Sequence, residues 1–556
     1  MDQANTEELI SKLISGTYEE FCKNIVVFLE IYDKKTNFEE LDSTYLREKL
    51  WKRLFYYLTD YVHVDQHHHC LAALRILRII SLIKIHSLYE KNLFHFTFKN
   101  RTNIWIHPIY MYLCNNCKSI IFLNNKRSII KSLKVIKFNI IIKNFTIESL
   151  KLLCNLLFNS VKVQQSQVLI SSLPYLIDRI KNYTIHDPYD VKLFDVRILF
   201  LLTALNTSTR DIIKTDLYGD VYLIKIIEEF AAQNQNSETE EITIICEVLK
   251  VLFNLYIHSD DIGVEDQEKY KNLVLILYKL LTLKYSVQHD DLESHIVNLL
   301  TVIPFSCYTS IIQTVNSKDC KDVYQKMDMS AICVLLRFLD KRLECKTYLL
   351  ENFSPIITAL VRLVKSERLV RKYIRLQILP PLKDVMNRPE EGTTLRAKLC
   401  KLLTSPITEL RDLVAELLFV LCKENVSRMV KYTGYGNAAG MFATKGLLGR
   451  SQAETAYSSE SEDSETEEYQ KYKERINPVT GCFEHSKPNP FEGMTEEQKE
   501  YEALKLVNLV DKLTKEGVVR PCRIGDDGKP EPIEHVLELQ NELPKQQYGR
   551  KDSDSE

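Results

Sequence analysis

Apolar residues recur at helical spacing along the first part of the chain, and two segments repeat nearly the same pattern. ESLKLLCNLLFNS (148–160) and EVLKVLFNLYIHS (247–259) are identical at seven of 13 positions, including Asn155 and Asn254. Both segments contain too few polar residues for a surface helix. We therefore expect inner helices that are buried on most sides.

The interval between the copies is typical of helical-repeat proteins. VRILFLLTALN (196–206) lies midway between the two segments, and HIVNLLTVIP (295–304) places Asn298 44 residues after Asn254. Intervals of about 44 to 50 residues are close to those of armadillo and HEAT repeats. Glycine and strict apolar–polar alternation are both rare, which disfavours strands. The sequence predicts an all-α, armadillo/HEAT-like solenoid over residues 1–425, with an extended concave groove.

The repeated asparagines allow two interpretations. On inner helices, the amides of Asn155, Asn254 and Asn298 can hydrogen-bond the main chain of a peptide in the groove. They can equally cap or bridge neighbouring helices within the stack. The pattern alone does not separate these roles.

Residues 83–145 interrupt the repeats. They are rich in Ile, Lys, Asn, Phe and Tyr and poor in Ala, Gly, Asp and Glu. Because the abundant residues share A/T-rich codons, one hypothesis is that part of the segment is translated intron. The other is an unusual repeat with a long loop. Sequencing the transcript across residues 80–146 separates the two.

The composition changes after residue 425. A Gly- and Ala-rich exit segment (426–450) precedes an acidic, Pro-containing linker (451–494), in which INPVTG and KPNPFEG favour turns. An amphipathic helix is predicted over residues 495–517, followed by a solvated tail (518–556). These segments together predict a flexible C-terminal arm.

The predicted arm helix has clear boundaries. Thr495 and Gln498 form a capping box at its start, and Gly517 ends it. Its apolar stripe consists of Ala503, Leu506, Val510 and Leu513.

KYTGYGNAAG (431–440) looks at first like a phosphate-binding loop. Gly434, Gly436 and Gly440 have the spacing G-x-G-x-x-x-G, which matches neither the dinucleotide fingerprint nor the P-loop. Both motifs also follow a strand, whereas a solenoid helix is expected here. We predict no nucleotide site and no other cofactor, but a close-packed turn where the arm leaves the solenoid.

Composition excludes several other classes. Lys and Arg number 73 against 75 Asp and Glu, so no basic field indicates nucleic acid. Lysines interrupt the most apolar runs, so we expect no membrane span. The polar start MDQANTEELI does not look like a signal peptide. The 14 scattered cysteines are typical of buried thiols in a reducing compartment, which predicts a cytoplasmic protein.

Two clusters contain metal-ligand residue types. Cys114 and Cys117 form a CxxC pair, and the run 67–70 contains three histidines and a cysteine. A structural zinc site needs four ligands in paired spacings, and no second cysteine pair complements the first. We expect no metal site.

A set of long segments resembles the synembryn family, also called resistance to inhibitors of cholinesterase. In chain order they are LKLLCNLL, FLLTALN, LKVLFN, KYTGYGNAAG, the acidic block that ends in TEEY, INPVTG, NPFEGMTEEQKE and KLVNLVDKL. Their order and spacing match the family, and residues 83–145 depart from it. The resemblance implies an armadillo-like protein of the cytoplasm and the cell cortex. It implies a guanine nucleotide exchange factor and folding chaperone for heterotrimeric G-protein α subunits, with no bond-making catalysis.

The resemblance also implies a binding mode. The concave groove binds the C-terminal helix of the α subunit, and the distal arm supports its nucleotide-binding domain. Arg75 in CLAALRILRII matches a groove arginine, whose guanidinium can bind the terminal carboxylate. A basic residue usually expected one turn later is Ile79 here, with Arg78 offset to another face. An ordinary surface salt bridge is the other interpretation of Arg75.

Ser459 and Ser464 match regulated positions of the family in its acidic block. Each has a glutamate three positions later, Glu462 and Glu467, which is the pattern of an acid-directed protein kinase. Phosphate adds negative charge to an acidic arm, so we expect it to dock on a basic surface. The candidates on the solenoid are Lys341, Arg342, Lys346, Arg396, Lys398 and Lys401. The alternative is that exposed serines are modified without effect.

The alternative function is an armadillo peptide-binding adaptor or scaffold without exchange activity. Adaptors of the nuclear-import kind pair Trp with Asn, but Trp51 and Trp105 are the two tryptophans, and neither lies beside a repeat asparagine. An enzyme would need a convergent nucleophile or acid–base set, and the sequence shows none.

Overall fold

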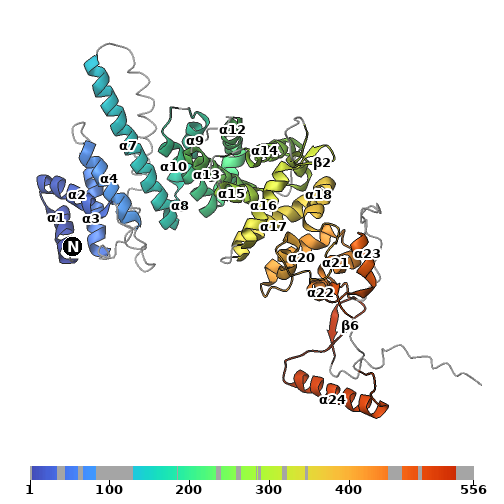
Figure 1. The fold of residues 1–556 in the computed structure, drawn as a ribbon. Coiled ribbons are helices and arrows are strands. Elements are labelled where there is room, and N and C mark those ends of the chain that lie inside the picture. The colour runs from blue at the N-terminus through green and yellow to red at the C-terminus, as the bar shows by residue number, and fades with distance from the viewer. Residues whose placement is uncertain are drawn as a thin grey trace, which may run out of the picture. The chain divides into compact units, whose positions relative to one another are not determined.

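The structure is a computed structural model in which helices form most of the chain, as the sequence predicts (Figure 1). It describes residues 3–33, 44–60, 67–82, 129–184, 186–232, 239–257, 264–283, 285, 290–315, 322–344, 349–448, 466–485 and 491–533. The chain divides into two compact units, Met1–Pro304 and Phe305–Glu556. Both units are stacks of paired helices of the armadillo-like kind.

The first unit has an inner and an outer row of helices. At its N-terminal end α1 (Gln3–Ser15), α2 (Tyr18–Tyr32), α3 (Thr44–Asp60) and α4 (His67–Leu82) pack together. The inner row runs from α4 through α7 (Ile129–Asn159), α10 (Tyr189–Leu205), α13 (Thr239–Tyr256) and α15 (Asp290–Val302), each packed on the next. The outer row contains α9 (Gln167–Lys181), α12 (Gly219–Ala232) and α14 (Val264–Thr282). Short turns are α8 (Val161–Gln164), α11 (Ser208–Asp211) and the π-helical η2 (Ile212–Asp216).

The expectation of inner helices buried on most sides is confirmed. Val196 and Leu199 of α10 and Val248 and Leu252 of α13 are completely buried. Full burial of one such side chain contributes about 1.5–3 kcal/mol. These two helices pack on each other, and α10 also packs on α7. The inner row is therefore the core of the unit.

Buried carboxylates join the outer row to the inner row. Asp195 of α10 is fully buried and forms a bidentate ion pair with Arg179 of α9. Asp220 of α12 is also buried; it accepts a hydrogen bond from Tyr256 of α13 at 3.1 Å and pairs with Lys269 of α14 at 2.7 Å. Because a buried charge is costly without a partner, these pairs fix how the two rows pack.

The second unit is built around α17 (Leu349–Ser366), which packs against η3 (Phe305–Ile311), α16 (Ser330–Glu344), α18 (Arg368–Ile378) and α20 (Thr408–Leu421). Helix α19 (Leu395–Leu402) packs on α20. A small antiparallel sheet with the order β1-β3-β2 precedes α16. Its strands are β1 (Gln313–Thr314), β2 (Val323–Tyr324) and β3 (Met327–Asp328).

Helical packing continues past residue 425, where the composition predicts that the solenoid ends. Helices α21 (Val426–Thr433) and α22 (Tyr435–Lys445) both pack on α20. Gly434 joins them with φ of 75°, a conformation that glycine adopts readily. The expected turn is present at Gly434. The expectation that the arm leaves here is wrong, because Gly436 and Gly440 lie within α22.

The end of the predicted linker is folded onto the second unit. Residues 466–485 form α23 (Glu467–Tyr472), the turn η4 (Lys473–Arg475) and a hairpin of β4 (Ile476–Asn477) and β5 (Cys482–Phe483). Thr466 donates its hydroxyl to the carbonyl of Leu382, and the amide of Phe483 donates to Val385 at 2.7 Å. The prediction of turns in INPVTG is confirmed, but this part is not a free linker.

The predicted arm helix is present as α24 (Glu496–Lys515), with the expected capping box between Thr495 and Gln498. Gly517 follows it with φ of 72°. A hairpin of β6 (Cys522–Ile524) and β7 (Pro530–Pro532) comes next. None of the residues of α24 is buried within the described chain.

Two further expectations concern residues 83–145 and membrane-spanning helices. Residues 83–128 lie outside them, and residues 129–145 form the first part of α7. Among the helices described, none is long and apolar enough to cross a membrane.

Candidate functional site

The inner row of the first unit carries the predicted groove residues, and their positions follow from the repeated segments. Glu148, Lys151 and Asn155 lie on α7, and Glu247, Lys250 and Asn254 occupy the equivalent places on α13. Spacings of three, four and seven residues place the members of each set on the same helical face. The face therefore repeats along the row.

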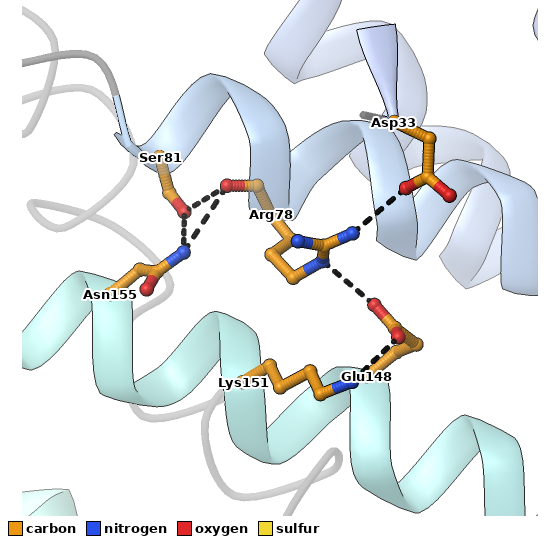
Figure 2. Close-up of polar contacts among 6 residues, drawn as sticks. All are labelled: Asp33, Arg78, Ser81, Glu148, Lys151 and Asn155. Carbon is orange, nitrogen blue, oxygen red and sulfur yellow. Dashed lines mark hydrogen bonds and ion pairs between the residues drawn. The ribbon is translucent and has the colours of Figure 1, made fainter. Parts of the chain in front are cut away.

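The acidic member of each set binds an arginine of the preceding inner helix. Arg78 of α4 donates from Nε to Glu148 at 2.9 Å and from Nη2 to Asp33 at 2.9 Å (Figure 2). Arg197 of α10 likewise donates to Glu247 at 2.7 and 3.0 Å. Both glutamates are nearly buried, so these pairs hold consecutive inner helices in register.

Lysines and aromatic rings extend these pairs into a continuous band. Lys151 pairs with Glu148 and lies 5.5 Å from the ring centre of Phe194, which also faces Arg197 at 5.5 Å. Lys250 pairs with Glu247 and lies 4.6 Å from the ring of Phe200. We call this band the inner-row ladder. It consists of Arg78, Glu148, Lys151, Phe194, Arg197, Glu247, Lys250 and Phe200.

Lys250 and Glu247 of the ladder lie close to His295 of α15. Burial and the nearby Lys250 ammonium lower the pKa of His295 below its usual 6.5. The imidazole is therefore neutral at pH 7, and it does not add to the positive charge of Lys250.

Asn155 bridges two inner helices. Its amide nitrogen donates to Ser81 Oγ at 3.1 Å and to the carbonyl of Arg78 at 3.3 Å, as Figure 2 shows. Its carbonyl oxygen Oδ1 has no hydrogen-bond partner among the described residues, and the side chain is half-buried. Asn155 therefore performs the bridging role, and its peptide-binding role stays a prediction.

Asn254 performs the bridging role alone. Its side chain is buried, and its amide nitrogen donates to Thr203 Oγ1 of α10 at 3.1 Å. A buried side chain cannot contact a peptide on the surface. The expectation that Asn254 lines the groove is therefore corrected by its burial. Asn298 on α15 is half-buried, and its main-chain carbonyl accepts from Thr301 at 2.6 Å.

Arg75 and Ile79 differ as the sequence suggests. Arg75 is half-buried on α4, and it makes no ion pair with any other residue that the structure describes. Ile79 is 1% exposed and belongs to the hydrophobic core of the N-terminal helices. The position where the resemblance leads us to expect a second basic residue is therefore core here, and Arg78 is paired with Glu148 and Asp33.

The predicted basic patch lies on two helices of the second unit that are linked by ion pairs. Lys341 and Arg342 lie in the last turn of α16, and Lys398 of α19 pairs with Asp340 at 2.6 Å and Glu344 at 3.2 Å. Arg396 and Lys401 lie on the same α19. Lys398 thus helps to join the two helices, and its charge is already shared with two carboxylates.

Several predicted positions lie outside the described residues. They are Ser459, Ser464, Lys346, Cys114, Cys117 and Trp105. Among the residues that the structure does describe, no three metal-ligating side chains come together.

Most of the ladder is absent from the sequence prediction. The prediction singles out the asparagines of the repeated segments, although Glu and Lys at the first and fourth positions recur identically. The arginine partners, Arg78 and Arg197, lie outside the two repeated segments 148–160 and 247–259. A search for opposite charges on neighbouring inner helices would have found them.

The chain matches the family model described as guanine nucleotide exchange factor synembryn over residues 53–529. Chaperone Ric-8 of Drosophila pseudoobscura pseudoobscura is 43% identical over 431 residues, which cover 73% of this chain and 76% of that protein. Chaperone Ric-8A of Xenopus tropicalis is 40% identical over 432 residues, covering 74% and 79%. The chain therefore belongs to the synembryn family of guanine nucleotide exchange factors, and these relatives carry the names chaperone Ric-8 and chaperone Ric-8A.

Proposed function

We propose that this protein promotes GDP release from heterotrimeric G-protein α subunits and assists the folding of newly made α subunits. Membership of the synembryn family carries this proposal. The proposed mechanism is conformational, and it makes or breaks no covalent bond. A protein that binds the nucleotide-free α subunit more tightly than the GDP-bound form raises the population of the former. GTP then refolds the α subunit and displaces the protein.

In this proposal the inner-row ladder faces the C-terminal helix of the α subunit. Arg75 binds the terminal carboxylate, because its guanidinium has no ion-pair partner among the described residues. The Oδ1 of Asn155, which has no hydrogen-bond partner among the described residues, accepts a main-chain N–H near that terminus. Half-buried Phe194 and Phe200 offer aromatic surface beside cations that are already partly neutralised. Asn298 remains a candidate at the far end of the row.

The helix α24 is the proposed second contact, with the nucleotide-binding domain of the α subunit. Tyr501, Leu504, Leu506 and Leu509 are each more than half exposed. Large apolar side chains on an exposed helix are typical of an interaction surface.

An acid-directed kinase is proposed to regulate this arrangement through Ser459 and Ser464. The described chain resumes at Thr466, which binds the carbonyl of Leu382. Asp384, which follows Leu382 by two residues, interacts electrostatically with Arg396 of the basic patch. Ser464 and Ser459 precede Thr466 by two and seven residues in the sequence, so we propose that this patch receives their phosphates.

The test is GDP release from a panel of purified α subunits with and without the full-length protein. Acceleration for at least one class is expected. A parallel assay follows the yield of GTP-binding α subunit synthesised in an extract depleted of its own family member. If neither release nor yield changes for any class, the proposed function is wrong.

A further inference from the structure

Gly434 and Gly436 of KYTGYGNAAG take part in the first of two close main-chain crossings on α22. The amides of Tyr435 and Gly436, at the start of α22, donate to the carbonyls of Pro478 and Val479 at 2.8 and 2.9 Å. A methyl group on Gly481 would lie 2.7 Å from Pro389 Cγ and 3.0 Å from Gly434 Cα. We call this crossing the first anchor. It satisfies two amides that a helix N-terminus leaves unpaired.

A second crossing lies at the other end of α22. The amide of Leu448 donates to the carbonyl of Gly528 in the β6–β7 turn at 3.2 Å. A methyl group on Gly528 would lie 2.1 Å from the carbonyl oxygen of Gly446, and one on Gly446 would lie 2.7 Å from the carbonyl oxygen of Asp527. Gly446 and Gly528 both have positive φ, of 68° and 74°. This crossing is the second anchor.

The two anchors close the intervening chain into a loop that contains α24. The loop begins at the first anchor, beside the start of α22. It returns to the second anchor, just after the end of α22. Helix α22 has 11 residues and is about 17 Å long, whereas α24 has 20 residues and is about 30 Å long. Helix α24 is therefore attached to the second unit on both sides, and it is not carried at the end of a free arm.

We propose that the two glycine anchors are positioning elements that present α24 to the α subunit as a doubly attached helix. This inference rests on the proposed function. A helix on a single tether explores a large volume, and binding must then compensate for the entropy that is lost. A second attachment shortens the free chain and raises the effective concentration of α24 at its partner.

Gly528→Ala tests the second anchor, because its added methyl group cannot fit against Gly446. Gly493→Ala is the matched control. Gly493 lies in the same loop and has φ of 86°, but apart from its chain neighbours no heavy atom of the described residues lies within 4 Å of the position that an added methyl group would take. Both variants carry the backbone strain of a non-glycine residue at positive φ, and only one disrupts a crossing. Leu448→Pro, which removes the amide donor, is a second way to open the same anchor.

Hydrogen exchange on the full-length protein measures the protection of the anchor amides in the absence of the α subunit. Gly528→Ala is expected to speed exchange of the Leu448 amide about tenfold or more, since local opening exposes that amide. The Gly436 amide of the first anchor should keep its wild-type rate. Equal Leu448 protection in Gly528→Ala and Gly493→Ala would overturn the second anchor.

GDP release then tests the positioning role. At saturating protein, Gly528→Ala is expected to lower the stimulated rate of GDP release about tenfold relative to Gly493→Ala. A tenfold loss is smaller than the full gain in effective concentration that a second attachment provides. Affinity for a peptide with the C-terminal sequence of the α subunit, bound by the first unit, should not change. Equal rates for the two variants would refute the positioning role. No stimulation by the wild-type protein would instead refute the proposed function.

Discussion

Arg75 and Arg78 lie three positions apart on one helix and have different electrostatic environments. Arg78 is held between Asp33 and Glu148, whereas Arg75 has no ion-pair partner among the described residues. A guanidinium that is already paired gains little from another carboxylate. Arg75 is therefore the better candidate for an incoming carboxyl group.

Arg75→Ala is predicted to weaken binding of a peptide from the C-terminus of the α subunit by about 1.5–3 kcal/mol, the range for a hydrogen bond to a charged group. Calorimetry or fluorescence anisotropy with the free peptide measures this. Lys225→Ala, on the outer helix α12, is the control and should bind normally. Unchanged affinity in Arg75→Ala would remove this residue from the site.

The asparagines show that the sequence predicts the position of a residue more readily than its contact partner. Their spacing correctly predicts equivalent positions for Asn155 and Asn254 on two inner helices, α7 and α13. Whether each faces a ligand or a neighbouring helix depends on the residue opposite. Thr203 covers Asn254, whereas Ser81 leaves one acceptor of Asn155 available. That residue lies 51 positions away for Asn254, and no local pattern identifies it.

His295 is predicted to make the first unit less stable in mild acid. Its folded-state pKa lies below 6.5 through burial and Lys250, so the unfolded chain binds protons more readily between the two values. Stability therefore rises with pH through that window and becomes level above about 6.5. Asp291 and Glu247 oppose the shift but do not reverse it.

His295→Gln should reduce the loss of unfolding free energy between about pH 7.5 and about pH 5.5, because it removes this titration. Urea unfolding at both pH values provides the measurement. His186→Gln, at an exposed position, should lose stability as the wild type does. If His295→Gln and wild type show the same loss, the histidine does not titrate as described.

At the scale of the helix, buried carboxylates decide how the two rows pack. Asp195 is fully buried, Arg179 donates to both of its oxygens, and the Tyr183 hydroxyl donates to Oδ2 at 2.9 Å. Burial is the main cause that raises the pKa of Asp195, and Arg179 opposes it. Removing the carboxylate leaves Arg179 without this partner.

Asp195→Ala is predicted to lower the unfolding free energy by about 3–5 kcal/mol, the usual cost of breaking a buried pair from one side. Glu228→Ala removes an exposed carboxylate of α12 and should change stability by less than about 0.5 kcal/mol. Chemical denaturation of the three proteins compares them. A loss below about 1 kcal/mol for Asp195→Ala would contradict the role given to this pair.

The helices are the easiest elements to predict, because their apolar period depends on nearby residues alone. The start of α24 agrees with the prediction to the residue, since the capping box from Thr495 to Gln498 is local. The predicted end of the helical stack at 425 is wrong. Helices α21 and α22 are short, α22 is rich in small residues, and its first amides donate to the carbonyls of Pro478 and Val479. Contacts over more than 40 residues leave no periodic trace in either segment.

At the scale of the whole molecule, phosphorylation is predicted to act on the second unit. Treatment with an acid-directed kinase should raise stimulated GDP release about tenfold, which corresponds to one new charge-assisted hydrogen bond of about 1.5 kcal/mol. The Ser459→Ala/Ser464→Ala double variant should not respond. Arg396→Ala should blunt the response if the basic patch receives the phosphates. An equal response of wild type and double variant would rule out the switch.

The attachment of residues 466–485 has a consequence for limited proteolysis. This segment is held by Leu382, Val385 and the start of α22, so its place in the fold does not depend on the chain that precedes it. A single cut between residues 449 and 465 would sever the polypeptide but leave those contacts intact. The two fragments should then elute together in gel filtration and separate under denaturing conditions. The two pieces expressed apart should likewise reassemble on mixing.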